Sequence, residues 1–214
     1  MLGPRRWQTL RDFGVTRTFR RGEYLLRQGD RGGFVLALTQ GRVQVTALGP
    51  DGRQLLQAVR GPGDLLGELS LAPEARRTAS VIALDPGAAW CVPASRFRRF
   101  LDTEHAHGAL RDYLIAKLSE TVPYQLQLVH FTPRQRIARL LLDVITLAGD
   151  HPQAMWIPFS QTAVAAALGL ARSTVAEQIG ILRERGVLAP GPRLVVTDIQ
   201  RLREEAGIGG DPPP

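Results

Sequence analysis

Residues 160–182 read SQTAVAAALGLARSTVAEQIGIL, and this stretch decides the fold of the last third of the chain. Ser160 is a favourable N-cap for a helix over residues 160–168, and a second helix is predicted over residues 171–184. Gly169 between them permits a tight turn. The side chains predicted to pack between the two helices are small or apolar: Ala165, Ala166, Leu168, Leu170, Val175, Ile179 and Leu182. The pattern is typical of a helix-turn-helix.

The second of these helices presents polar side chains in its first turns. A helix that reads DNA places this end against base edges in the major groove. Arg172 can bond guanine O6 and N7 together, and Glu177 can accept from cytosine N4. The residues predicted to contact bases or phosphates are Ser160, Gln161, Thr162, Arg172, Ser173, Thr174, Glu177 and Arg193. The alternative is a packing motif without DNA, in which Arg172 is a solvated surface charge.

Residues 186–196, GVLAPGPRLVV, predict two short strands about a Pro-Gly-Pro turn. Such a hairpin is the wing of a winged helix-turn-helix, and it carries Arg193. The wing and the Arg-Ser-Thr turn agree with each other, which favours binding to double-stranded DNA. The tail over residues 208–214 is rich in Gly and Pro and is predicted to be disordered.

The first part of the chain has a different pattern. Twelve of its 22 glycines fall in residues 1–67, with short runs of strand character between them. The predicted strands cover residues 24–26, 34–38, 42–47, 54–59, 78–83 and 88–92. Their spacing indicates an antiparallel sandwich or barrel over about residues 13–95.

Glycine is sparse from residue 95 to residue 150, and apolar residues recur at helical spacing. A heptad seam is formed by Leu114, Leu118, Thr121, Gln125 and Leu128. A long helix with such a seam predicts a homodimer. Pro123 opposes a straight helix, because an interior proline costs on the order of 3 kcal/mol, so the helix bends or ends there. Thr132 and Pro133 predict the N-cap and first turn of a further helix over residues 134–148.

The net charge of +7, with a pI of about 10.8, suggests a polyanionic partner such as nucleic acid. Lys117 is the only lysine and asparagine is absent, so composition bias is the alternative explanation. Residues 1–103 hold 16 arginines and 9 acidic residues, whereas residues 152–214 hold six of each. The DNA prediction therefore depends on where individual arginines lie, not on net charge.

Composition also excludes several classes of protein. Cys91 is the only cysteine, which excludes a disulfide, an iron–sulfur cluster and a multi-cysteine zinc site, and it is expected in a buried strand. His105 and His107 do not share a helix face, so neither haem nor metal is expected. No apolar run reaches the roughly 18–20 residues of a membrane span, and residues 1–7 lack the core of a secretory signal, so a cytoplasmic protein is predicted. No nucleophile–base spacing appears, which argues against an enzyme.

A second motif suits an anion. Residues 61–70 read GPGDLLGELS and residues 76–80 read RRTAS. Gly67 lets a ligand approach the backbone closely, where free N–H groups can donate. Arg77 supplies a planar cation for phosphate, and Glu68 can accept from a ribose hydroxyl. The alternative is a structural Arg–Glu pair in a loop.

With residues 20–30, RRGEYLLRQGD, the order of these motifs resembles the Crp/Fnr family of bacterial transcription regulators over roughly residues 10–206. The resemblance implies an α+β fold, with an N-terminal β-roll (a jelly-roll-like cyclic-nucleotide-binding domain), a long dimerisation helix and a C-terminal winged helix-turn-helix. The implied domains are residues 1–103, 104–131 and 132–207, followed by the tail.

The resemblance further implies a homodimer that binds a pseudo-palindromic DNA site and works through RNA polymerase at promoters. The sequence is most similar to the cyclic-AMP receptor protein branch, which implies cyclic AMP as the small-molecule effector. The residues that match the effector contacts of that branch are Gly67, Glu68, Leu69, Ser70, Arg77, Thr78 and Thr121.

Departures from that branch leave the effector open. The segment between Glu68 and Arg77 is one residue shorter, Val122 replaces a hydroxyl residue that reaches across the dimer, and Pro123 adjoins the base site. Glu177 stands where the branch has arginine, so the DNA consensus should differ. The alternative is a constitutive regulator of the same family with a vestigial or different pocket. The target promoters and the choice between activator and repressor stay open.

Overall fold

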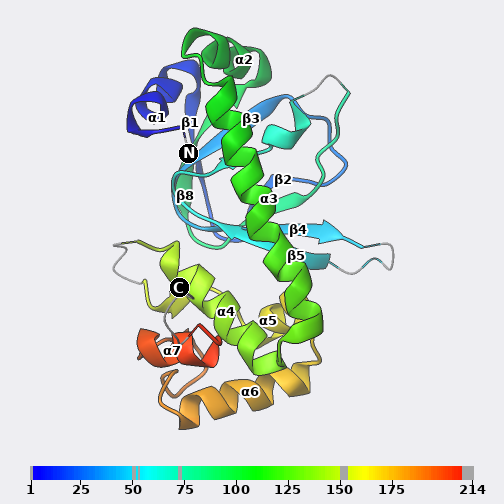
Figure 1. Cartoon of the computed structure of the whole chain (residues 1–214), viewed down its shortest axis with the longest axis vertical. Helices are drawn as coiled ribbons and strands as arrows, with labels where there is room; N and C mark the ends of the chain where they lie inside the picture. Colours follow the sequence, from blue (N-terminus) through cyan, green and yellow to red (C-terminus); the bar gives the residue numbers. More distant parts are fainter. Residues whose placement is uncertain (1, 50–51, 53, 72–73, 150–153, 209–214) are drawn as a thin grey trace, which may run out of the picture. The chain divides into compact units, whose positions relative to one another are not determined.

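The computed structural model describes all residues except 1, 50–51, 53, 72–73, 150–153 and 209–214, and only the backbone of residues 120–129. Contacts divide the chain into two compact units (Figure 1). The first consists of Met1–Gly52 and Gln57–Tyr124, and the second of Arg53–Leu56 and Gln125–Pro214. This division falls inside helix α3 (His107–His130), so the three-part division at residues 103 and 131 remains a proposal.

Two four-stranded antiparallel sheets form the first unit. One has the strand order β1-β8-β3-β6 and the other the order β2-β7-β4-β5. The strands are β1 (Val15–Phe19), β2 (Tyr24–Leu26), β3 (Phe34–Gln40), β4 (Val43–Leu48), β5 (Gln54–Arg60), β6 (Leu65–Leu66), β7 (Ser80–Ala83) and β8 (Gly87–Pro93). The antiparallel two-sheet prediction is confirmed. The sequence prediction missed two strands. Strand β1 is mostly exposed, so it lacks a clear apolar pattern, and β6 is only two residues long.

Strand β3 explains why the two sheets pack as they do. Successive side chains of a strand point to opposite faces. Leu36 and Leu38 enter the core between the sheets, whereas Val35 and Ala37 enter a second core on the outer face. All four are fully buried, so β3 reads as one continuous apolar run rather than an alternating one.

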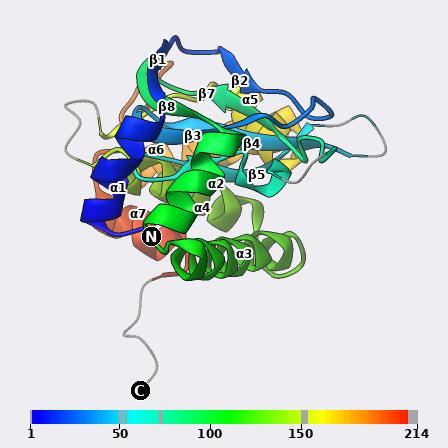
Figure 2. The same cartoon turned by 90° about the horizontal axis from the view of Figure 1, so that it is seen from above.

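The second core is covered by helices that cluster on one side of the sheet (Figures 1 and 2). They are α1 (Pro4–Leu10), the short 3-10 helix η1 (Arg11–Phe13), α2 (Ala94–Thr103) and the first part of α3 (His107–His130). Phe97 and Phe100 of α2 are fully buried there, with Phe100 packed edge-on against Phe13. This aromatic cluster fixes α2 on the sheet and sets where α3 begins.

Helix α3 continues through Pro123, so the helix does not end there. Of the predicted seam, Leu114 is half-buried and Leu118 is 65% exposed. The side chains of Thr121, Gln125 and Leu128 lie outside the described part of the structure. No helix of the described residues is long and apolar enough to cross a membrane.

The second unit contains the predicted pair of helices. Its elements are α4 (Pro133–Thr146), β9 (Trp156–Ile157), α5 (Gln161–Leu168), α6 (Arg172–Glu184), β10 (Leu194–Val195) and α7 (Ile199–Glu205). Ser160 caps α5 by accepting from Ala163 N at 3.1 Å, as expected. Gly169 ends α5 with φ +62°, a left-handed conformation that glycine adopts without strain.

The packing of this unit corrects some of the sequence predictions. Val175, Ile179 and Leu182 are fully buried, but Leu170 is half-buried and Ala166 is exposed, so Ala166 does not form the close crossing. The predicted hairpin over residues 186–196 is also different. Its first half forms a single bridge from Leu188 to Val196, with backbone hydrogen bonds between Ala189 and Val195 and between Thr197 and Val187. Strand β10 also pairs with β9.

Helix α4 begins at a capping box. Thr132 Oγ1 accepts from Gln135 N, and the Gln135 side chain accepts from Thr132 N at 3.0 Å. Thr132→Ala removes the acceptor, so we expect the free energy of unfolding to fall by about 1 kcal/mol in urea titrations. Thr146→Ala, an exposed position at the other end of the same helix, is the matched control and should change little. Equal losses in both variants would contradict the capping role.

Candidate functional site: an anion cavity and a helix-turn-helix

A cavity of about 330 Å³ lies in the first unit and is lined by residues that include members of β2, β4, β5, β6, β7, the 3-10 helix η2 (Glu68–Ser70) and α3. Its volume is near the lower end of the range of about 300–1,000 Å³ for small-molecule sites. Six of the seven predicted effector residues line it: Gly67, Glu68, Leu69, Ser70, Arg77 and Thr78. We call these six residues the cassette. Thr121 is in α3, and its side chain lies outside the described part of the structure.

Gly67 is the turning point of the cassette. It follows β6 directly and has φ +84°, a conformation that L side chains rarely adopt. A Cβ atom added there would lie 2.2 Å from Nη1 of Arg77, so the guanidinium would have to shift from its present position. Glycine is therefore required both for the backbone conformation and for the close approach of Arg77.

Arg77 is buried, with 4% of its surface exposed. Its Nη1 donates to Gly67 O and its Nη2 donates to Phe34 O, each at 2.8 Å. The guanidinium also lies over the Phe34 ring, 4.9 Å from the ring centre. Burial lowers the pKa of Arg77, with Glu68 opposing the shift. Among the described residues Arg77 forms no hydrogen bond or ion pair with Glu68, so the loop pair left open by the sequence is not observed.

The Glu68 carboxylate faces the cavity without a side-chain partner among the residues that the structure describes. Burial raises its pKa most strongly and Asp64 also raises it, whereas a hydrogen bond from its own backbone N–H, Arg60 and Lys117 lower it. A desolvated carboxylate with open acceptor positions can take a hydrogen bond from a ligand hydroxyl.

The remaining cassette residues differ in their exposure. Ser70 is buried, and its hydroxyl donates to Arg76 O at 3.3 Å. Thr78 is exposed, and Leu69 is 59% exposed although it is apolar. Thr78 is thus available to a ligand, whereas the Ser70 hydroxyl is already used within the protein.

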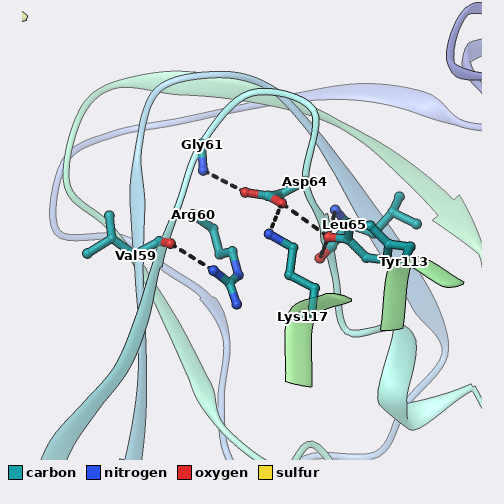
Figure 3. A network of polar contacts seen from close by, with 7 residues as sticks. All are labelled: Val59, Arg60, Gly61, Asp64, Leu65, Tyr113 and Lys117. Carbon is teal, nitrogen blue, oxygen red and sulfur yellow. Dashed lines mark hydrogen bonds and ion pairs between the residues drawn. The ribbon is translucent and has the colours of Figure 1, made fainter. Parts of the chain in front are cut away.

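A network centred on Asp64 adjoins the cavity (Figure 3). Asp64 accepts from Gly61 N at 3.0 Å and from the Tyr113 hydroxyl at 3.2 Å, and it pairs with Lys117 Nζ at 2.6 Å. Sequence reasoning missed these residues as functional candidates. The available signal was Lys117, the one lysine in a chain with 26 arginines.

In the second unit, α6 is divided into a buried side and an exposed side. Arg172, Ser173 and Glu177 are exposed, whereas Thr174 is partly buried. Ser173 and Glu177 are four residues apart and so share one face of the helix. The arrangement leaves the first turns of α6 free to enter a groove, as the sequence predicts.

Helix α4 packs against both helices of the helix-turn-helix. Arg136 of α4 donates to Leu168 O, the last residue of α5, and burial lowers the pKa of Arg136. Arg183, near the end of α6, donates to Gly191 O in the turn before Arg193. The side chain of Arg193 is exposed. Helix α5 is capped by Ser160 and begins with Gln161 and Thr162. The side chains of Ser160 and Thr162 are exposed.

In the part of the chain that the structure describes, Cys91 and the histidines form no further site. Cys91 is half-buried in β8, not fully buried as expected, and burial raises its pKa. His107 pairs with Asp102 at 2.7 Å on the surface. Within the described residues, no group of three or more His, Cys, Asp or Glu side chains could hold a metal ion.

Comparisons with known proteins agree with both parts of this site. Residues 16–104 match the family model of the cyclic nucleotide-binding domain, and residues 135–205 match the Crp-like helix-turn-helix domain. The transcriptional regulator LdrP of one Thermus thermophilus strain is 30% identical over 88% of this chain and 95% of its own. The cyclic AMP receptor protein of another strain of Thermus thermophilus is 27% identical over 97% of this chain and 95% of its own.

Solved structures give the same result. A transcriptional regulator of the CRP family from Thermus thermophilus superposes with a TM-score of 0.74 and 27% identity, covering 89% of this chain and 96% of that chain. The cassette thus precedes the helix-turn-helix in one chain, in the order that the sequence predicts. The chain belongs to the Crp/Fnr family of DNA-binding transcription regulators.

Proposed function

We propose that the protein is a homodimeric regulator that binds a pseudo-palindromic promoter site, acts through RNA polymerase, and is controlled by cyclic AMP or a similar nucleotide. The observation that carries the proposal is the cavity in which the buried cation Arg77 and the open carboxylate Glu68 line the same wall region. A buried guanidinium and a partly buried carboxylate at one cavity can bind a ligand that carries both an anionic group and a hydroxyl.

The chemistry of this wall matches a cyclic nucleotide. A guanidinium has five N–H donors, of which Arg77 spends two on the carbonyls of Gly67 and Phe34. The remaining donors can reach a phosphate, and Thr78 adds an exposed hydroxyl. Glu68 can accept from the ribose hydroxyl. The other side of the cavity is largely apolar, with Val45, Ala47 and Leu114 in its lining, which suits a base.

The relatives support this effector without deciding it. One of them is named as a cyclic AMP receptor protein, whereas the name of LdrP states no effector. The contacts to the base also depend on Thr121, Val122 and Pro123, whose side chains lie outside the described residues. The second candidate is therefore a regulator of the same family that uses another ligand or none.

Dimerisation is supported by the surface of α3. Ile115 and Leu118 are apolar yet 56% and 65% exposed. Pairing α3 with a second copy of itself would bury both residues about a two-fold axis. A two-fold dimer presents two copies of α6, which explains the proposed pseudo-palindromic site with half-sites about one helical turn apart.

Selection of bound sites from random DNA, with and without cyclic AMP, tests the proposed function. We expect a two-fold symmetric consensus and a higher DNA affinity when cyclic AMP is present, because the ligand favours the conformation that binds DNA. The same affinity with and without the ligand would favour the constitutive alternative. Failure to recover any consensus would contradict the DNA-binding role.

Glu68→Gln tests the role of the carboxylate in the cavity. Loss of a charge-assisted hydrogen bond should weaken cyclic AMP binding by about tenfold in calorimetry. Arg77→Ala is a poorer test, because Arg77 also holds the carbonyls of Gly67 and Phe34.

Without ligand, Glu68→Gln should stabilise the protein in a pH-dependent way. Burial raises the folded-state pKa of Glu68 above its usual 4.5, so ionisation opposes folding. At pH values below 4.5 the variant and the wild type should unfold alike. As the pH rises through the window above 4.5, the wild type should become less stable than the variant. Glu74→Gln, an exposed carboxylate outside the cavity lining, is the control; a similar effect there would refute the assignment.

Arg172→Ala and Arg193→Ala separate base reading from phosphate contact. Arg172 lies at the start of α6, so its loss should cost about 1–3 kcal/mol of binding and relax the preference at one base pair. Arg193 lies in the wing, so its loss should weaken binding to all sequences alike. Binding titrations against the selected site and single-base variants measure both effects, and an unchanged base preference in Arg172→Ala would contradict the assignment.

A further inference from the structure

The Asp64 network joins two parts of the first unit that the proposed function must couple (Figure 3). Asp64 lies in the turn between β5 and β6, directly before the cassette, whereas Tyr113 and Lys117 lie one turn apart on α3. The same carboxylate binds both α3 side chains and also the backbone of Gly61. The turn and the helix are therefore tied through one group.

Tyr113 strengthens this tie from the helix side. Its hydroxyl donates to Asp64 Oδ1 and accepts from Leu65 N at 3.0 Å, so it bridges the turn and the first residue of β6. Tyr113 is 4% exposed. Burial and the neighbouring Asp64 raise its pKa, which keeps the hydroxyl protonated as a donor.

The connection along the chain between the Asp64 network and the cassette is short. Leu65 and Leu66 pair with Ala37 and Leu36 of β3, and Gly67 follows at once. Asp64 O also accepts from Leu38 N at 2.8 Å. Because an extended chain spans at most about 3.5 Å per residue, Glu68 and Asp64 are joined by a short stretch of chain.

The ion pair is shielded from water, which makes its geometry consequential. The side chains of Lys117 and Asp64 are 19% and 10% exposed. Removing one partner of such a pair leaves a desolvated charge, so the pair holds one arrangement firmly.

Resting on the proposed function, we infer that Asp64, Tyr113 and Lys117 form a latch that transmits occupancy of the cavity to α3. They act as positioning residues: when a ligand draws the cassette onto its phosphate, the latch carries the displacement to the helix. Occupancy and helix position then bias each other equally, as linkage requires.

The test compares Asp64, which is buried, with Asp85, which is partly buried, in the whole chain. Asp64→Asn weakens the latch, whereas Asp85→Asn weakens the ion pair of Asp85 with Arg42, and Asp85 lies in the turn between β7 and β8. The readout is the DNA affinity with saturating cyclic AMP divided by the DNA affinity without it. Because the ligand is saturating, a change in the affinity for cyclic AMP does not alter this ratio. We expect Asp64→Asn to reduce this ratio by about tenfold and Asp85→Asn to leave it unchanged.

Tyr113→Phe guards against a folding defect, because it removes one hydroxyl and keeps the buried ring. It should reduce the ratio in the same direction as Asp64→Asn. An unchanged ratio in both latch variants would overturn the inference. So would an equal reduction in Asp85→Asn, because the effect would then be one of general stability.

A ligand-free arm keeps this inference separate from the effector proposal. Gly67→Ala displaces the cassette, since its Cβ would meet Arg77. We expect amide hydrogen exchange of residues 107–118 to change in Gly67→Ala, and this change to vanish when Asp64→Asn is added. If the wild type ignores cyclic AMP but this pattern is seen, the effector proposal fails and the latch stands. If Gly67→Ala leaves α3 unaffected, the latch is wrong.

Discussion

The buried guanidinium of Arg77 is the interaction on which the site depends. It joins Phe34 at the start of β3 to Gly67 at the head of the cassette, because it donates to the backbone carbonyl oxygens of both residues. The contact works only because Gly67 has no Cβ and adopts a positive φ. Burying a cation is costly unless it is well paired, and these carbonyls keep Arg77 in place beside the cavity while leaving donors for an anion.

Asp64 complements Arg77 at the other end of β6. Arg77 fixes the cassette to the sheet, and Asp64 fixes the turn before it to α3. Between them, the strand has two residues. A ligand that binds Arg77 and Glu68 thus acts on a short, doubly anchored segment. This short connection between the cavity and α3 is the physical basis for proposing that a small molecule controls the position of a helix.

The sequence predicted the parts whose signals are local. Ser160, Gly169 and Thr132 act on their own helix ends, so their caps and turns were predicted correctly. The six predicted effector residues line one cavity, and their role in binding stays a prediction. The pairing of β10 with β9 and the Asp64 network were missed, because both depend on residues far apart in the chain. Tyr113 illustrates the limit: its apolar ring fits a helical repeat, and only the fold shows where its hydroxyl lies.

The most direct measurement is amide hydrogen exchange of the wild-type protein with and without cyclic AMP. The account predicts protection of residues 65–70 by the ligand, together with a change over residues 107–118 of α3. Protection confined to the cassette, with α3 unaffected, would contradict the claim that the cavity and the helix are coupled.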